Sequence, residues 1–338
     1  MQNGLKLLTM LILSFLCLCL AACIGSVAVP VSQVIKIVAN RLLGLPLSEN
    51  ISALNATVVW NLRMARACLA FLAGAALAAS GTVMQSVLRN PLASSYTMGV
   101  SSGASLGAAI IIISGFSLPI LGRFTLPAAG LLAGLLTVFL AVSLAAKVDK
   151  GFSGNTIILT GMVFSLFVNA LLTLIAYFFQ SHTRNILLWQ MGTFALKDWS
   201  YVYLLFPIVM IGLILLLYHS RELDLLTFGE EQAAVMGVET TKVKWRLLSV
   251  AAALTGSAVA FCGVIGFIDL IAPHVVRRWC GASHRWVVPV SALFGGCFMV
   301  LADMVARTII SPSELPVGAI TALIGAPFFA YIYFKRRK

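Results

Sequence analysis

Long apolar runs alternate with short polar segments along most of the chain. A helix needs about 20 apolar residues to cross the hydrocarbon core of a bilayer, so each run predicts one membrane-spanning helix. The predicted spans are 7–29, 64–87, 93–113, 125–146, 155–179, 200–218, 247–267, 270–281, 287–308 and 317–334. The eighth is short and ends in Arg277 and Arg278, so its boundaries are the least sharply marked. The pattern predicts an all-α polytopic membrane protein with about ten transmembrane helices and both termini on one side.

Two segments are too polar to span. Residues 30–62 are predicted to form an external segment after the first helix, and residues 219–246 the longest cytoplasmic connection. The second segment holds nearly half of the eleven acidic residues of the chain: Glu222, Asp224, Glu230, Glu231 and Glu239. This concentration of acids indicates that the connection has a function beyond joining two spans.

The composition supports a membrane location. Hydrophobic residues make up 60% of the 338 positions, charged residues only 10%, and the mean hydropathy is +1.01. Soluble domains carry about 25% charged residues, because their surfaces face water. We therefore expect one transmembrane domain over residues 1–338, solvated largely by lipid, with no soluble domain attached.

The placement of charge predicts the orientation. The net charge is +12, and the basic residues lie between the apolar runs and at the C-terminus, in Lys335, Arg336, Arg337 and Lys338. With both termini in the cytoplasm, fifteen of the 23 basic residues face inward, as the positive-inside rule requires. This distribution predicts a multi-pass protein of the bacterial cytoplasmic (inner) membrane and argues against a nucleic-acid partner.

The cysteines and the N-terminus carry weak signals. The seven cysteines lie in or at the end of apolar runs without metal-ligand spacing, so we expect small buried side chains and no metal site. Lys6 and the run that ends in Leu20-Ala21-Ala22-Cys23 resemble a lipoprotein signal. The many spans that follow favour an ordinary uncleaved first helix instead.

Glycines and charges inside the spans suggest packing and pairing. Gly99, Gly103 and Gly107 share one helical face, which lets helices approach closely or line a path, and packing is the preferred interpretation. A charged side chain in an apolar run costs about 2.5–3.5 kcal/mol on membrane insertion, so each one needs a structural or functional explanation. Asp303 and Arg307 are spaced to pair on one face.

Two further polar residues lie near the junction of the seventh and eighth spans. Asp269 is predicted to lie close to the external surface, and His274 has no partner that would make it a metal or proton site. The sequence contains no Gly-x-x-x-x-Gly-Lys-Ser/Thr motif and no catalytic arrangement in an aqueous pocket. We expect no catalytic residue and no enzymatic activity in this chain.

The acidic connection contains a short amphipathic run, Gly229 to Val238, with a glycine near each end. It predicts a small helix outside the membrane. Such a helix could be a solvated connector or a docking surface for a cytoplasmic partner, with Ala233, Ala234 and Met236 as a shallow apolar contact. The spacing alone leaves both interpretations open.

Several segments together resemble one family, the iron-siderophore, haem and vitamin B12 permeases of ABC importers. They occur in the expected order over residues 60–330. They are Asn61-Leu62-Arg63-Met64-Ala65-Arg66 with Gly74 and Gly81 to Gln85; Arg89-Asn90-Pro91-Leu92-Ala93 with Gly99 to Ala104; Gly229 to Val238; and Gly266 to His274 with Arg277, Gly281, His284-Arg285, Asp303, Arg307, Glu314 to Gly318 and Gly325 to Phe328.

The resemblance implies a type II ABC importer permease fold and a set of partners. These are a second copy or a similar permease, two cytoplasmic ATPase subunits, an extracytoplasmic binding protein and an iron-chelate ligand. ATP and Mg would be bound by the ATPases, and no cofactor by this chain. The residues implied to couple to the ATPase are Gly229, Glu230, Glu231, Ala233, Ala234, Met236 and Gly237, within the connection of about 219–246.

The resemblance also implies roles at the outer face and along the path. Arg63, Arg66 and Arg307 match positions that pair with acids of the binding protein, which suits exposed, permanently charged guanidiniums. Interfacial anchoring is the alternative for Arg63 and Arg66. The residues expected to line the path, which opens alternately to each side at the dimer interface, are Gly99, Gly103, Phe164, Phe167, Asn169 and Tyr177.

Two positions depart from the family pattern, and the ligand is only partly indicated. Ala65 replaces the usual proline, which is expected to loosen the entry of the second helix, and Asp269 replaces the usual glycine. We expect a ferric siderophore or haem as the ligand, with cobalamin as the alternative. An ion-coupled secondary transporter is the alternative from another class, but it needs grouped intramembrane acids, whereas those of this chain are few and scattered.

Overall fold

The computed structural model describes residues 2–25, 29–47 and 51–335, and all regular structure in that part is helical. The elements are α1 (Gln2–Cys23), α2 (Val31–Leu43), α3 (Ala53–Thr57), η1 (Val58–Met64), α4 (Ala65–Val87), α5 (Val100–Ser114), η2 (Gly122–Phe124), α6 (Thr125–Val148), α7 (Gly154–Phe178), α8 (Gln180–Gln190), α9 (Trp199–Tyr218), α10 (Ser220–Phe228), α11 (Glu230–Val235), α12 (Thr240–Cys262), α13 (Ile268–Cys280), α14 (His284–Thr308) and α15 (Val317–Lys335).

Each of the ten predicted spans has its helix. In the described part of the chain, seven helices are long and apolar enough to cross a membrane. The shorter helices α5, α13 and α15 correspond to the remaining three spans. The prediction of about ten helices is therefore confirmed. Of the C-terminal basic cluster, Arg336, Arg337 and Lys338 lie outside the described residues.

Some predicted boundaries are wrong. The span 93–113 begins only at Val100, because residues 91–99 form turns and Gly99 has a left-handed φ of 89°. The polar segment 30–62 is largely helical, and its end runs through η1 into α4 without a break. Ala65 is fully buried within this continuous helix, where it keeps the backbone N–H that a proline would lack. The expected loosening at Ala65 is thus not seen.

Helix α4 forms the centre of the bundle, in contact with α9, α12, α13 and α14. All of its residues from Leu72 to Val87 are buried, and many of them are Ala or Gly, which let neighbouring helices approach closely. A Cβ on Gly74 would lie 2.2 Å from the carbonyl oxygen of Gly295 on α14. Glycine is required at this crossing because any side chain would separate the two helices.

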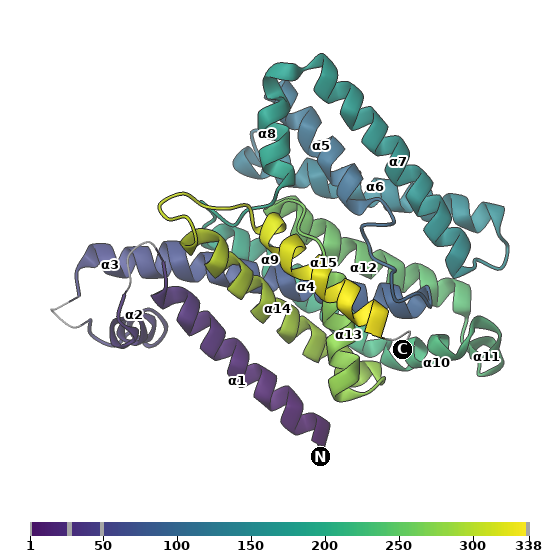
Figure 1. Cartoon of the computed structure of the whole chain (residues 1–338), viewed down its shortest axis with the longest axis horizontal. Helices are drawn as coiled ribbons and strands as arrows, with labels where there is room; N and C mark the ends of the chain where they lie inside the picture. The colour runs from purple at the N-terminus through teal and green to yellow at the C-terminus, as the bar shows by residue number, and fades with distance from the viewer. Residues whose placement is uncertain (1, 26–28, 48–50, 336–338) are drawn as a thin grey trace.

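A second group of helices, α5 to α8, lies at the upper right of Figure 1. Helix α5 packs on α6, and Cβ atoms on Gly103 and Gly107 would lie 2.2 Å from Thr137 Oγ1 and 2.5 Å from the carbonyl oxygen of Ala129. The packing interpretation of this glycine series is confirmed. Helix α12 contacts both α4 and α6 and so joins the two groups.

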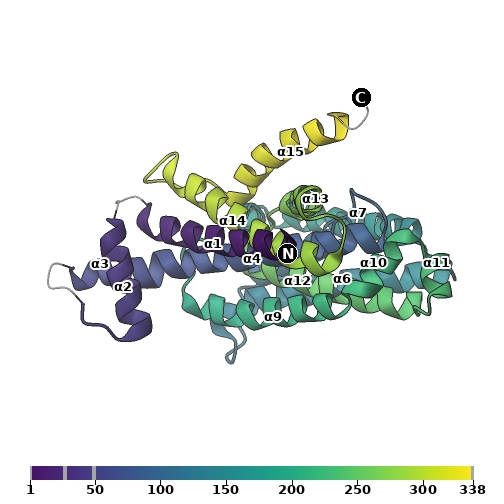
Figure 2. The same ribbon diagram turned by 90° about the horizontal axis from the view of Figure 1, so that it is seen from below.

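The bundle has two distinct ends. One, which we call the arginine end, carries α2, α3 and the loop before α15, and the other, the α11 end, carries α10 and α11 (Figure 1). The N-terminal end of α1 and the C-terminal end of α15 both point toward the α11 end. Helix α15 leans away from the bundle (Figure 2), and its Leu323 is 72% exposed.

Candidate functional site

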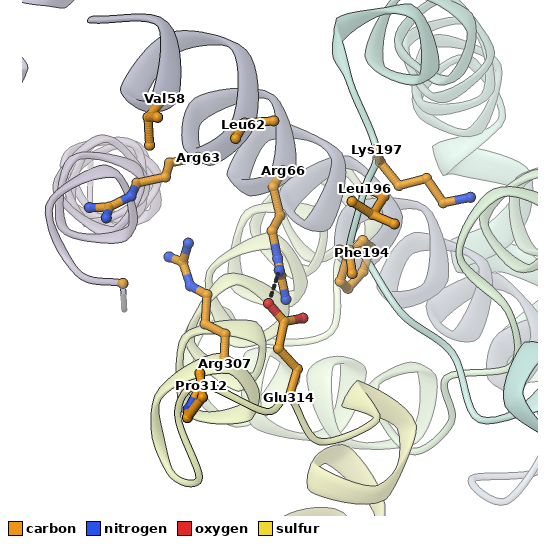
Figure 3. A pocket seen from close by; sticks show the side chains of 12 residues that line it. Val58, Leu62, Arg63, Arg66, Phe194, Leu196, Lys197, Arg307, Pro312 and Glu314 are labelled. Carbon is orange, nitrogen blue, oxygen red and sulfur yellow. Dashed lines mark hydrogen bonds and ion pairs between the residues drawn. The ribbon is translucent and has the colours of Figure 1, made fainter. Parts of the chain in front are cut away.

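The three predicted docking arginines converge at the arginine end. Arg63 and Arg66 come from the helix that continues from η1 into α4, and Arg307 from the last turn of α14 (Figure 3). Together with residues of η1 and of three loops they line a cavity of about 270 Å³. The other lining residues are Gly25, Val58, Leu62, Phe194, Ala195, Leu196, Lys197, Pro312 and Glu314.

Arg66 holds two acids at once. Its Nε lies 2.9 and 3.0 Å from the two carboxylate oxygens of Asp303, its Nη2 2.7 Å from Asp303 Oδ1, and its Nη1 2.8 Å from Glu314 Oε1. Such forked, charge-assisted contacts fix both partners in orientation. The predicted pair of Asp303 and Arg307 is present at 3.9 Å, but Arg66 is the closer partner of Asp303.

Arg63 and Arg307 bind the C-terminal end of α1. Arg63 Nη1 donates to the carbonyls of Cys23 at 3.2 Å and Ala22 at 3.4 Å, and Arg307 Nη2 donates to that of Ala21 at 2.6 Å. The last carbonyls of a helix lack intrahelical donors and carry partial negative charge, which a guanidinium satisfies. Both arginines are only 7% exposed, so the expectation of exposed guanidiniums is wrong for this chain. Their docking role stays a prediction.

Two apolar residues at this end are more exposed than any arginine. Leu196, at the rim of the cavity, is 97% exposed and has a φ of 57°, and Ile120, in the α5–α6 loop, is 98% exposed. Loops commonly carry binding residues, so these two side chains are available to a partner. The sequence pattern did not reveal them, because a single apolar residue in a loop has no periodicity.

The α11 end contains the predicted short helix. Helix α10 ends at Phe228, Gly229 follows with a φ of 132°, and α11 is followed by Gly237 with a φ of 87°. Both glycines adopt conformations that other residues rarely take, which explains their places around the helix. A hollow of about 610 Å³ beside α11 is lined by Arg89, Gly151, Ser153, Phe228, Gly229, Glu230, Glu231, Gln232, Ala234 and Thr240.

The predicted coupling residues divide into exposed and internal ones. Glu231, Ala234, Met236 and Gly237 are exposed, as a docking surface requires. Ala233 is fully buried in the core, so its predicted contact with a partner is wrong. Val235 is 89% exposed, as a docking contact requires, and the sequence pattern does not indicate it, because a helix of this length gives too few residues to define a face.

Glu230 also turns inward. Its carboxylate pairs with Lys244 of α12, whose ammonium is buried and donates at 2.8 Å to the carbonyl of Phe152 in the α6–α7 loop. The Phe152 ring stacks on Trp245 at 5.8 Å. Glu230 therefore connects α11 to two other parts of the chain and is not a free docking charge.

The predicted path residues do not form one surface. Gly99 and Gly103 pack against Thr137 of α6, which excludes them from an open path within this chain. On α7, Phe167 and Tyr177 are 60% and 68% exposed, Asn169 is exposed and Phe164 is half-buried. The exposed face of α7 is the part of the prediction that remains available to a path or a partner.

Asp269 does not lie near the arginine end. Its carboxylate accepts from Ser94 Oγ, and a Cβ on Gly81 would touch its backbone carbonyl. Gly81 is fifteen residues along α4 from Arg66, a rise of about 22 Å at 1.5 Å per residue. The predicted position at the external mouth is wrong, because the chain turns back into the bundle after Gly263 before α13 begins.

Comparisons with known proteins agree with this architecture. The model of the FecCD transport family matches residues 11–335. The ABC transporter permease protein YvrB of Bacillus subtilis is 40% identical, over 93% of this chain and 89% of that protein. The hemin transport system permease protein HmuU of Yersinia pestis is 38% identical, over 83% of this chain and 84% of its own length.

A solved structure gives the same result for the fold. A metal-chelate type ABC transporter in an inward-facing conformation superposes with a TM-score of 0.85 and 30% sequence identity, covering 98% of this chain and 99% of that one. The ion-coupled secondary transporter is thereby set aside. This chain belongs to the FecCD transport family and is a non-catalytic, membrane-spanning permease subunit of an ABC importer.

Proposed function

We propose that this chain forms the translocation path of an ATP-driven importer for an iron chelate, either a ferric siderophore or haem. The observation that carries the proposal is the exposed surface of α11, formed by Glu231, Ala234, Val235 and Met236. An exposed apolar patch beside acids, on a helix outside the bundle, suits a partner protein rather than lipid. We assign this surface to the cytoplasmic ATPase, with one ATPase subunit on each permease of a dimer.

The arginine end then faces the binding protein. Four basic residues line its cavity, whereas Asp303 and Glu314 are the acids within reach of Arg66. The resulting positive field would attract an acidic partner and orient it, which affects the association rate more than the affinity. Because the guanidiniums are fixed by internal contacts, they would present their remaining donors in one geometry.

The translocation path is proposed to lie between two permeases, along the exposed face of α7. That face combines Phe167, Tyr177 and Asn169, so it offers aromatic area with a polar group and weak binding. Closure of the two ATPases would move α11 and open the path alternately to each side. Crosslinks across the dimer at Asn169 should change with nucleotide state, and their absence in every state would count against this path.

The ligand class is supported by the relatives. Among them are the Fe(3+) dicitrate transport system permease protein FecD of Escherichia coli, 38% identical, and the hemin permease named above. A corrinoid is the second candidate, because the cobalamin import system permease protein BtuC of Halobacterium salinarum is also 38% identical. Uptake of a ferric hydroxamate, haem and cobalamin by one reconstituted complex separates these ligands directly.

Co-purification with the ATPase and ligand uptake test the proposal together. Glu231→Arg and Val235→Asp should each weaken ATPase binding and abolish uptake, because they place a charge on the docking surface. Ile120→Asp is the matched control for ATPase binding alone, since it places the same charge on a 98% exposed residue of the α5–α6 loop, outside α11. If the native chain binds no ATPase and still moves ligand down an ion gradient, the importer proposal fails.

A further inference from the structure

A buried polar chain begins directly beside the ATPase-facing segment. Asp224 of α10 accepts two hydrogen bonds through Oδ1, one from the backbone N–H of His284 at 2.8 Å and one from the ring Nδ1 of His284 at 2.5 Å. Ser283 Oγ lies 3.4 Å from its second oxygen. Asp224 thus caps the first turn of α14, where a carboxylate is favoured, and fixes the imidazole at the same time.

The chain continues into the centre of the bundle. His284 is 1% exposed, and its Nε2 lies 2.6 Å from Ser86 Oγ on α4. Arg277 of α13 donates to the same Ser86 Oγ at 2.8 Å and to Gln85 Oε1 at 2.7 Å. The side-chain amide of Gln85 is in turn 3.5 and 3.4 Å from the carbonyls of Asp269 and Leu270, in the first turn of α13.

The donors and acceptors of this chain match when the imidazole of His284 is neutral and Ser86 turns its hydroxyl toward His284 instead of the Thr82 carbonyl, which lies 2.9 Å away. Since the Asp224 carboxylate only accepts, His284 Nδ1 carries a proton and donates it. The Ser86 hydroxyl then donates to His284 Nε2 and accepts from Arg277, which also donates to the Thr82 carbonyl at 3.0 Å. Every link is satisfied with a neutral, Nδ1-protonated imidazole, an assignment that follows from the hydrogen bonds.

We propose that Asp224 and His284 are positioning residues that transmit displacement of α10 and α11 to α4 and α13. The inference rests on the proposed function and names the internal route by which that function works. A buried hydrogen bond cannot lengthen without leaving polar groups unpaired, so these contacts hold the helices together as they move. The pair of Glu230 and Lys244 leads instead to α12, and the attachments through Leu223, Leu226 and Ala233 are apolar and can slide.

The variant His284→Asn tests the contact between His284 and Ser86 separately from the contact between His284 and Asp224. His284→Asn keeps a donor near Asp224 but cannot reach Ser86. With the ATPase bound in proteoliposomes, we expect ATP hydrolysis to continue while ligand imported per ATP falls about 10-fold, a typical size for coupling between two sites. The ligand is a ferric hydroxamate or haem, whichever the native complex imports. Ser86→Ala removes the link from the other side with a smaller change in volume.

Controls separate transmission from folding. His182→Asn in α8 repeats the substitution at a site outside this chain of contacts and should leave the import ratio unchanged. The double variant His284→Asn/Ser86→Ala should be no worse than either single variant, because both break one link. Thermal unfolding of each variant reports its effect on stability.

The outcomes are distinct. Continued hydrolysis with lost import supports the inference. A native import ratio in His284→Asn and Ser86→Ala overturns it, and so does a parallel loss of hydrolysis and import, which would indicate a purely structural role. Failure of the native complex to import any of the ligands overturns the proposed function itself, whereas the other outcomes leave that function standing.

Discussion

The two ends of the bundle use buried charge differently. At the arginine end, Arg66 and Asp303 hold each other, and Arg63 and Arg307 bind the carbonyls of α1, so the charges join helices that form one compact surface. At the α11 end, buried charged groups connect a short peripheral segment to distant helices, through Lys244 in one case. The difference suggests a rigid docking platform at one end and a coupled, movable segment at the other.

The largest expected effect is at the arginine end. Asp303→Asn removes the carboxylate that pairs with Arg66, whose side chain is 11% exposed while that of Asp303 is 2% exposed. Removal of one partner from a buried pair leaves an uncompensated charge and costs about 3–5 kcal/mol. The apparent midpoint of thermal unfolding in detergent should fall accordingly.

Glu314→Gln is the matched control for this prediction. The Glu314 side chain is 37% exposed and meets the same arginine at 2.8 Å, so its loss should cost about 0.2–1 kcal/mol. Equal shifts in the two variants would show that Asp303 is not the main anchor of Arg66, and the idea of a rigid platform would lose its basis.

An intermediate effect is expected at the α11 end. Lys244→Met keeps much of the side-chain volume but leaves the Phe152 carbonyl without its donor and Glu230 without its cation. The cost should be about 1–3 kcal/mol, because the Glu230 side chain is 27% exposed and water can reach it. We also expect weaker co-purification of the ATPase, since α11 loses its anchor.

Lys242 provides the comparison for Lys244. It pairs with Glu239 at 2.7 Å, but both side chains are about two-thirds exposed, at 69% and 67%. Lys242→Met should therefore change stability by less than about 0.5 kcal/mol and leave ATPase binding intact. An unchanged ATPase interaction in Lys244→Met would contradict the view that Glu230 and Lys244 hold α11 in place.

The spans could be predicted because the thickness of the bilayer imposes their length on the sequence. Boundaries were less predictable, since polar residues such as Asn55 and Asn61 interrupt the apolar pattern while the helix continues through them. The pair of Arg66 and Asp303 joins residues 237 positions apart, and no local period could reveal it. The sequence analysis singles out Arg66 and Asp303, but for different reasons and not as a pair.

The segment that we propose to dock the ATPase could be predicted from the sequence more readily than its exposed face. Gly229 and Gly237 marked the ends of α11, because their backbone angles require glycine. Ala233 and Val235 are both apolar and are equally plausible contacts for a partner by residue type. Ala233 is buried, however, and Val235 is exposed. Asp269 was misplaced for a related reason, since the turn at Gly263 reverses the chain direction without a long polar loop to signal it.

The smallest effect concerns Asp149, in the α6–α7 loop at the α11 end. Hydrogen bonds from the Ser153 hydroxyl and amide, and from the Thr156 hydroxyl, lower the pKa of this carboxyl below its ordinary value of 3.8. Stabilisation by a group with a lowered folded-state pKa is complete above the unfolded-state value and disappears as the pH falls through the folded-state value. Asp149→Asn should therefore lower the unfolding midpoint modestly at neutral pH.

The difference between native protein and Asp149→Asn should then narrow as the pH falls below the ordinary value of 3.8, because the unfolded chain takes up a proton there before the folded carboxyl does. Ser153→Ala removes the strongest of these contacts, a hydrogen bond of 2.6 Å to Asp149, and should weaken the same pH dependence. A difference that stays constant with pH would mean that shape alone, and not the ionised carboxylate, organises this loop. The loop carries Phe152, the acceptor for Lys244, so its order determines how firmly α11 is held.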